Sequence, residues 1–133
     1  MRAEVVKVST KPDLALLRCP DLIAPPLPLA SQGARRGQDI MVLGYPEMFS
    51  LGASLKATRG VISGMPNPAL DNLYLYDAVT NSGNSGGPVF DQKGNVVAVH
   101  CVGYNTASRY GGGIPVDDYL GQPCCRPQHD HLG

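Results

Sequence analysis

The sequence has little charge and no excess of either sign. Charged residues make up 17% of its 133 residues, against about 25% in ordinary soluble domains. The formal net charge is zero, because 11 Lys and Arg are balanced by 11 Asp and Glu. A chain without a basic field does not hold a phosphate backbone, so we expect no nucleic-acid partner. Hydrophobic residues reach 43%, which is enough for a buried core and argues against global disorder.

Long apolar runs are also missing. The longest ones, such as Leu14–Leu17 and Val96–Val99, are far shorter than the roughly 20 residues that cross a bilayer. We therefore expect no transmembrane helix. Met1 is not followed by the charged and apolar regions of a signal peptide, because Ala3–Val8 already alternates like a strand. The sequence is thus expected to begin inside a domain.

Cysteine is present without a recognisable framework. The spacing of the four cysteines matches neither a disulfide scaffold nor the paired C-x-x-C of a zinc site, so the redox compartment stays undecided. The segment Cys124–His131 gathers two thiols and two imidazoles that could catch a soft metal. Irregular terminal segments are usually frayed polar ends, so we expect a disordered tail over 122–133 and no metal site.

Glycine and proline are abundant, at 16 and 12 residues, and they divide the chain into short apolar segments. Such segments between turn signals are typical of a β-sandwich or barrel and disfavour a helical bundle. Asp91–Asn95 predicts a hairpin, since Gly94 can take the positive φ of a tight turn. Only Pro115–Leu120 resembles a helix, of one or two turns. The eight predicted strands are Ala3–Val8, Leu14–Arg18, Asp39–Leu43, Ser54–Ile62, Leu73–Ala78, Pro88–Asp91, Asn95–Val102 and Gly111–Val116.

The most informative stretch is Asp77–Val89, which contains Gly83-Asn84-Ser85-Gly86-Gly87-Pro88. A serine flanked by glycines lies in a tight loop, where backbone N–H groups can converge on one point as an oxyanion hole requires. This makes Ser85 the candidate nucleophile. A flexible surface turn has the same composition, so the surrounding segments have to decide.

These surroundings resemble the trypsin-like serine peptidases, and among them the bacterial Deg or high-temperature-requirement type, over residues 3–120. The resemblance implies an all-β fold: the six-stranded Greek-key C-terminal barrel of a two-barrel peptidase, over 38–121. It makes 1–22 the remnant of an N-terminal barrel and the proline-rich 23–37 the inter-barrel connector. Besides the serine loop, the matching segments are Asp13–Leu17, Gly44–Pro46, Thr58–Ser63 and Gly113–Val116.

The resemblance also implies roles for individual residues. Ser85 would attack the scissile carbonyl, and the N–H groups of Gly83 and Ser85 would hold the oxyanion. Asp13 would orient the general-base histidine, although an acid after Pro12 in isolation would be a turn or capping residue. No cofactor is required, and the expected partner is a peptide or unfolded protein substrate.

Substrate binding is implied for two further places. Val79, six residues before the serine, would lie at the base of the specificity pocket and would favour small or medium apolar side chains. Cys101, Val102 and Gly103 would form the edge that accepts the substrate as an added strand. We interpret the thiol of Cys101 as a small buried hydrophobe rather than a reactive group.

The general base is where the sequence departs from the family. The family places its histidine before the aspartate, but no histidine precedes Asp13, and His100, His129 and His131 all follow Ser85. His100 lies in mid-strand and is expected to be a structural or rim residue. A serine without a base is a poor nucleophile, so we expect the isolated chain to be an N-terminally truncated peptidase that is nearly inert.

Two other functions fit part of the pattern. Gly83-x-Ser85-x-Gly87 also matches the nucleophile elbow of an α/β-hydrolase esterase, but the helix required after the serine is excluded by Gly86-Gly87-Pro88. A non-catalytic peptide-binding pseudopeptidase remains as the alternative, since a fold does not determine function. Oligomeric state and compartment are undecided, because relatives include secreted and periplasmic enzymes and a missing N-terminus would remove any signal peptide.

Overall fold

The computed structural model describes residues 2–46, 52, 54–80, 83–103 and 110–116. The predicted strands all occur in the predicted order, with ends shifted by at most two residues. Of the predicted helix Pro115–Leu120, Pro115 instead ends strand β8, Val116 is helical, and residues 117–120 lie outside the described residues. The strands are β1 (Glu4–Thr10), β2 (Asp13–Arg18), β3 (Asp39–Gly44), β4 (Lys56–Gly64), β5 (Tyr74–Tyr76), β6 (Pro88–Phe90), β7 (Val96–Gly103) and β8 (Gly111–Pro115).

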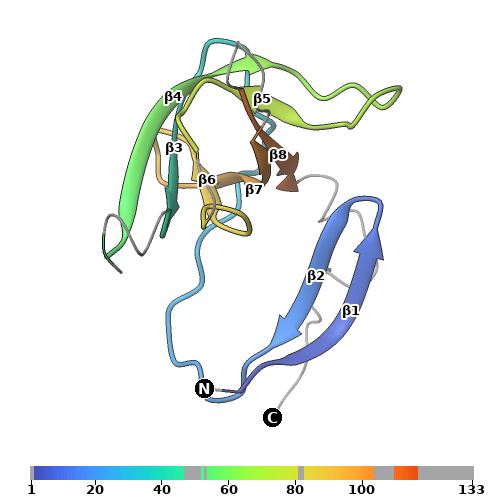
Figure 1. Cartoon of the computed structure of the whole chain (residues 1–133), viewed down its shortest axis with the longest axis vertical. Helices are drawn as coiled ribbons and strands as arrows, with labels where there is room; N and C mark the ends of the chain where they lie inside the picture. The colour runs from blue at the N-terminus through green and yellow to red at the C-terminus, as the bar shows by residue number, and fades with distance from the viewer. Residues whose placement is uncertain (1, 47–51, 53, 81–82, 104–109, 117–133) are drawn as a thin grey trace.

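Six of the strands close into an antiparallel barrel in the order β3-β4-β5-β8-β7-β6 (Figure 1). The predicted all-β class and six-stranded barrel are therefore confirmed. Because side chains alternate across a strand, Ile40 and Val42 of β3 point into the barrel while their neighbours are half-buried. The predicted hairpin joins β6 to β7, where the N–H of Asp91 donates to the carbonyl of Asn95 at 2.9 Å.

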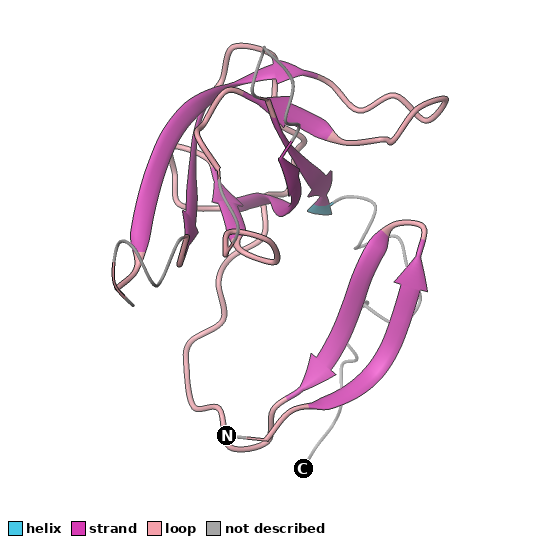
Figure 2. Ribbon diagram, viewed as in Figure 1, coloured by secondary structure: helices cyan, strands magenta, loops and turns pink. Residues whose placement is uncertain are grey.

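The first two strands form a separate two-stranded hairpin beside the barrel (Figures 1 and 2). Its register pairs Thr10 with Asp13 at the turn, which faces the barrel near β8. Apolar side chains of the hairpin, among them Val5, Val8 and Leu17, are more than half exposed. The hairpin therefore gains little from burial in this chain, and an isolated pair of strands is marginally stable at best.

The connector between hairpin and barrel is extended, as its prolines predict, and it also makes one bridge. Leu29 pairs in parallel with Val96 of β7. The N–H of Ala30 donates to the carbonyl of Val96 at 2.9 Å, and the N–H of Val96 donates to the carbonyl of Pro28 at 2.8 Å. The end of the connector is thus attached to the barrel wall although its prolines prevent a regular ladder.

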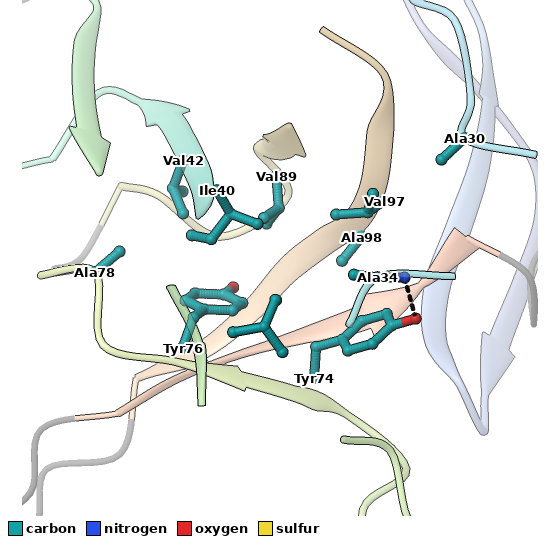
Figure 3. Close-up of a cluster of buried hydrophobic side chains, with 11 residues drawn as sticks. Ala30, Ala34, Ile40, Val42, Tyr74, Tyr76, Ala78, Val89, Val97 and Ala98 are labelled. Atoms are coloured by element: carbon teal, nitrogen blue, oxygen red, sulfur yellow. Dashed lines mark hydrogen bonds between the residues drawn. The ribbon is translucent and has the colours of Figure 1, made fainter. Parts of the chain in front are cut away.

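The barrel interior is packed around two tyrosines of β5 (Figure 3). Tyr74 and Tyr76 are buried, and the N–H of Ala34 donates to the hydroxyl of Tyr74 at 2.9 Å. The ring of Tyr76 lies over β8, whose Gly111 and Gly113 are its neighbours across and along the sheet. Glycine weakens a strand, but here the missing side chains provide the space that the tyrosine ring fills.

We predict that Gly111→Ala destabilises the barrel. The added Cβ would lie 2.7 Å from Cε2 of Tyr76, a distance that forces the buried ring or the strand to move. Overpacking of this kind costs about 1–3 kcal/mol. The measurement is the free energy of unfolding by urea denaturation.

The matched control is Gly103→Ala. Gly103 pairs with Gly111 across β7 and β8, but a Cβ there would meet its nearest neighbour, the hydroxyl oxygen of Thr80, at 3.6 Å. We expect little change for this variant. Equal losses of stability in the two variants would contradict the proposed packing of Tyr76.

Candidate active site

The glycine–serine loop follows a chain path that leaves the barrel wall at the end of β5. Oδ1 of Asp77 accepts a hydrogen bond from the N–H of Val61 in β4 at 2.8 Å. The side chain thus takes over a bond that a strand backbone would otherwise make. The sequence predicted that this strand would end at Ala78. The side-chain bond of Asp77 explains why β5 ends at Tyr76 instead. The strand pairing of β5 therefore ends at Tyr76, before the chain reaches Ser85.

The far side of the loop rests against the end of β3. Gly83 has φ of 103°, and its carbonyl accepts a hydrogen bond from the N–H of Tyr45 at 3.2 Å. A Cβ at Gly83 would lie 2.2 Å from the carbonyl oxygen of Tyr45, so only glycine fits this conformation and this contact. The backbone of the loop is therefore positioned by its close approach to β3.

Asn84 is a second residue of the loop that packs closely against β3. Its side chain is 2% exposed, and a Cβ at Gly44 of β3 would lie 2.3 Å from its Oδ1. Its Nδ2 has no hydrogen-bond partner among the residues that the structure describes. A buried amide is costly to leave unpaired, so its inward position reflects the tight packing of the loop rather than a gain in hydrogen bonding.

β7 holds the loop from its other side. The N–H of Gly86 donates to the carbonyl of His100 at 2.7 Å, and the N–H of His100 donates to the carbonyl of Gly87 at 2.9 Å. Ser85 is exposed. Within the described part of the chain, the N–H groups of Gly83 and Ser85 donate no hydrogen bond. The loop thus presents an exposed serine together with two backbone N–H groups that have no hydrogen-bond partner among the described residues.

The side chain of His100 points away from this serine loop and into the barrel. It is 2% exposed, and its Nδ1 is hydrogen bonded to the hydroxyl of Tyr76. Burial lowers the pKa of His100 below its ordinary value of 6.5 and raises the pKa of Tyr76 well above its usual range. Both groups are therefore neutral at pH 7, and the tautomer of the imidazole decides which of the two donates the hydrogen bond. The structure supports the expectation of a structural histidine.

The β1–β2 turn and the barrel enclose a cleft of about 760 Å³. Asp13, Cys101 and Val102 line it together, whereas Ser85 is not among the described residues that do. The thiol of Cys101 donates to the carbonyl of Gly112 at 3.6 Å. Burial, with smaller contributions from the charges of Asp13 and Asp71, raises the pKa of Cys101 to about 11. The thiol is therefore protonated at neutral pH, as the interpretation of an unreactive cysteine requires.

The candidate substrate residues lie in two places. β7 pairs with β6 only as far as Val99, but with β8 as far as Gly103, which leaves the other edge of Cys101–Gly103 unpaired within the described residues. An unpaired strand edge can accept a peptide as a further strand. Val79 is 65% exposed, so it is available to a ligand but not enclosed by the described residues.

The described residues contain no group of three or more His, Cys, Asp or Glu side chains that could hold a metal ion. The segment Cys124–His131 lies outside the described residues. Among the residues that are described, no helix is long and apolar enough to span a membrane.

The family profile described as trypsin-like peptidase domain matches residues 1–99. The chain belongs to this family. Its sequence is 36% identical to the serine protease Rv3671c of Mycobacterium tuberculosis over 104 residues, which cover 73% of this chain and 26% of that protein. It is 32% identical to a probable periplasmic serine endoprotease, DegP-like, of Halomonas elongata, over 88% of this chain and 26% of the relative. The chain thus spans about a quarter of these relatives' length.

Solved structures agree with the family assignment. The active form of the Rv3671c protease superimposes with a TM-score of 0.79 at 29% identity, covering 98% of this chain and 61% of that one. The HtrA-type protease AlgW, crystallised with a decapeptide, gives 0.77 at 28% identity and covers 89% and 38% of the two chains. The predicted relation to Deg-type serine peptidases is confirmed.

Sequence reasoning did not find the contact between Tyr76 and His100, or the packing of Asn84 on Gly44. The alternation of side chains along β7 indicates that His100 points inward, because it falls on the same face as the fully buried Ala98. The partner of the histidine cannot be read in the same way, since β5 and β7 are not adjacent in the barrel.

We predict that Cys101 of the folded protein is alkylated slowly by iodoacetamide. With its pKa raised from 9.0 to about 11, its thiolate fraction at pH 7.5 falls about a hundredfold. The rate should rise about tenfold per pH unit to above pH 10. Peptide mass spectrometry after timed labelling measures it, with urea-unfolded protein as the control. A rate that levels off near pH 8.5 would contradict the raised pKa.

Proposed function

We propose that the chain carries the nucleophile half of a serine endopeptidase, in which Ser85 forms the acyl-enzyme. The observation that supports it most is the loop conformation: an exposed serine, glycine at a positive φ beside it, and N–H groups of Gly83 and Ser85 that have no partner among the described residues. Donors placed in advance around a developing oxyanion are the largest single contribution to acyl transfer in many enzymes.

Asp13 is proposed as the acid that orients the general base. It lies at the start of β2, in the hairpin that we assign to a first barrel over residues 1–22, with 23–37 as the connector to the barrel over 38–121. Asp13 shares a cleft with Cys101 and Val102 of the proposed substrate edge. A histidine that met Asp13 on one side and Ser85 on the other would complete the triad arrangement.

The base itself is not supplied by the described part of this chain. His100 is buried, and its Nδ1 is already bonded to Tyr76, so it cannot accept the proton of an exposed serine. His129 and His131 lie outside the described residues. We therefore infer that the isolated chain has almost no endopeptidase activity and depends on a histidine supplied from another segment.

We infer the substrate class from the unpaired strand edge of Cys101–Gly103 and from Val79. Main-chain hydrogen bonds to Cys101–Gly103 would align an extended peptide as an added strand, independent of its sequence. Val79 has no charge to pair with Lys or Arg, so the site favours small or medium apolar side chains before the scissile bond. The homologous protease AlgW was crystallised with a decapeptide. This supports an extended peptide as the ligand.

We predict that Ser85 reacts with a fluorophosphonate when the chain is fused behind the segment that precedes the matched region of Rv3671c, where the family pattern places its histidine. A base within reach makes the serine nucleophilic, whereas the unfused chain should label at least a hundredfold more slowly, as general-base loss implies. Labelling is measured by mass spectrometry of the Ser85 peptide. Ser85→Ala in the fusion is the control.

Two results would overturn the assignment. Equal labelling of the Ser85→Ala fusion would place the nucleophile elsewhere. Robust peptide cleavage by the unfused chain that is abolished by His100→Ala would show that His100, despite its burial, is the base.

A peptide-binding pseudopeptidase is the second candidate, and the unpaired edge of Cys101–Gly103 favours it because strand addition needs no histidine. We predict that such a module binds an apolar decapeptide equally well with Ser85 or with Ser85→Ala, measured by fluorescence anisotropy. Binding in both forms, together with absence of Ser85 labelling in the fusion, would establish the binding module. Labelling in the fusion would establish the peptidase.

A further inference from the structure

The buried pair of His100 and Tyr76 connects the two chain segments that lead into and support the serine loop. Tyr76 is the last residue of β5, directly before Asp77, where the path to Ser85 begins. His100 lies in β7 and exchanges two backbone hydrogen bonds with the loop, at Gly86 and Gly87. A bond between the two side chains therefore joins the entrance of the loop to the strand that holds its exit.

The pair spans the inside of the barrel rather than following a sheet edge. β8 lies between β5 and β7 in the barrel, and it carries glycine where the two side chains pass over it. The Tyr76 hydroxyl would be 3.0 Å from a Cβ at Gly113, the residue paired with His100. Any larger residue at this place would push the tyrosine away from the histidine. The glycines of β8 therefore leave the space that the hydrogen bond between Tyr76 and His100 needs.

We propose that the His100–Tyr76 hydrogen bond is a positioning device for the nucleophile loop, and that it makes the geometry of this loop sensitive to acid. The bond is formed by neutral partners in an apolar interior, where a hydrogen bond is electrostatically strong and a charge is costly. Protonating the imidazole would place a charge in this interior, while Nδ1–H could still donate to the tyrosine oxygen. The cost of that buried charge would favour a conformation in which His100 is hydrated and β7 no longer holds Gly86.

Among the described residues, no charged group near His100 compensates its protonation. From β5 the facing group is the neutral Tyr76, and the residues opposite on β8 and in the loop are glycines. The next residue along β7, Cys101, has a thiol whose pKa is raised and which interacts with Tyr76. Within the described residues, no carboxylate contributes to the shifted pKa of His100, which burial alone lowers. An imidazolium here would therefore be unpaired.

The direction of the pH effect follows from the lowered pKa. When the loop opens, His100 is hydrated and titrates near its ordinary 6.5; when the loop is closed, it resists protonation. The closed loop is therefore fully favoured above about pH 6.5 and is progressively lost as the pH falls below that value. The inference rests on the proposed role of Ser85, but the constraint on the loop can be measured without any catalysis.

The test is amide hydrogen exchange of the full chain, expressed as protection factors so that the intrinsic pH dependence is removed. Tyr76→Phe deletes the hydroxyl that is bonded to His100 and keeps the ring. We expect the protection of the Gly86 amide at pH 7 to fall about tenfold, as loss of a buried hydrogen bond implies. The Ala34 amide, which is bonded to Tyr74, should keep its protection.

Tyr74→Phe is the matched control, because it removes one buried hydroxyl from the same strand. Here the Ala34 amide should lose protection and the Gly86 amide should keep it. Equal loss at Gly86 in both variants would show a general loosening of the barrel and would overturn the positioning role. The same conclusion follows if Gly86 is unaffected in Tyr76→Phe.

The acid dependence is tested with His100→Asn, whose amide oxygen can accept from Tyr76 but does not titrate. In the unmodified chain, Gly86 protection should fall severalfold between pH 7 and pH 5, by at most about 25-fold; in His100→Asn it should stay level. A fall of the same size in His100→Asn would overturn the inference. This variant also decides the matter if Tyr76→Phe does not fold.

Failure of this inference is distinguishable from failure of the proposed function. If Ser85 of the fusion does not label but Gly86 behaves as expected, the loop is positioned by the pair and the peptidase assignment is wrong. If Ser85 labels and Gly86 is unaffected, the peptidase assignment stands and the positioning role is wrong.

Discussion

The structure depends on one tyrosine ring inside a narrow barrel. Tyr76 is fully buried, and its ring occupies space that Gly111 and Gly113 leave open. A closed six-stranded barrel has to be filled by side chains, so a large ring on one strand requires small residues on the neighbouring strand that it covers. The tyrosine hydroxyl then needs a partner, which His100 provides. Packing of the core and support of the serine loop are consequently the same interaction.

Much of the fold could be predicted from the sequence. Alternating apolar residues and glycine or proline punctuation placed the strands within two residues of their ends. The closed order of the barrel came from the family resemblance, because strand periodicity carries no information about which strands pair. The early end of β5 was missed because the side chain of Asp77 competes with the backbone for the N–H of Val61. The Leu29 bridge was missed because proline-rich segments rarely pair.

The candidate site was predictable to a different degree at each residue. The exposed position of Ser85 follows from a glycine-rich loop. The inward orientation of His100 agrees with strand alternation, but its contact with Tyr76 depends on the curvature of the whole barrel. The burial of Asn84 could not be predicted, because an asparagine in a glycine-rich turn is usually exposed and here its Nδ2 lacks a partner among the described residues.

The two proposed catalytic residues are supported to different extents, and this difference has a chemical consequence. Ser85 is attached to β3 through Gly83 and to β7 through Gly86, so its loop has rigid elements on both sides. Asp13 lies on a two-stranded hairpin with exposed apolar side chains, which gains little from packing. Catalytic groups have to be held within about 0.5 Å of their working positions. In this chain the loop that carries the proposed oxyanion donors is better supported than the hairpin that carries the proposed acid. If these roles hold, the barrel alone provides the oxyanion donors, whereas proton transfer requires both a histidine and a structure that holds Asp13 against it.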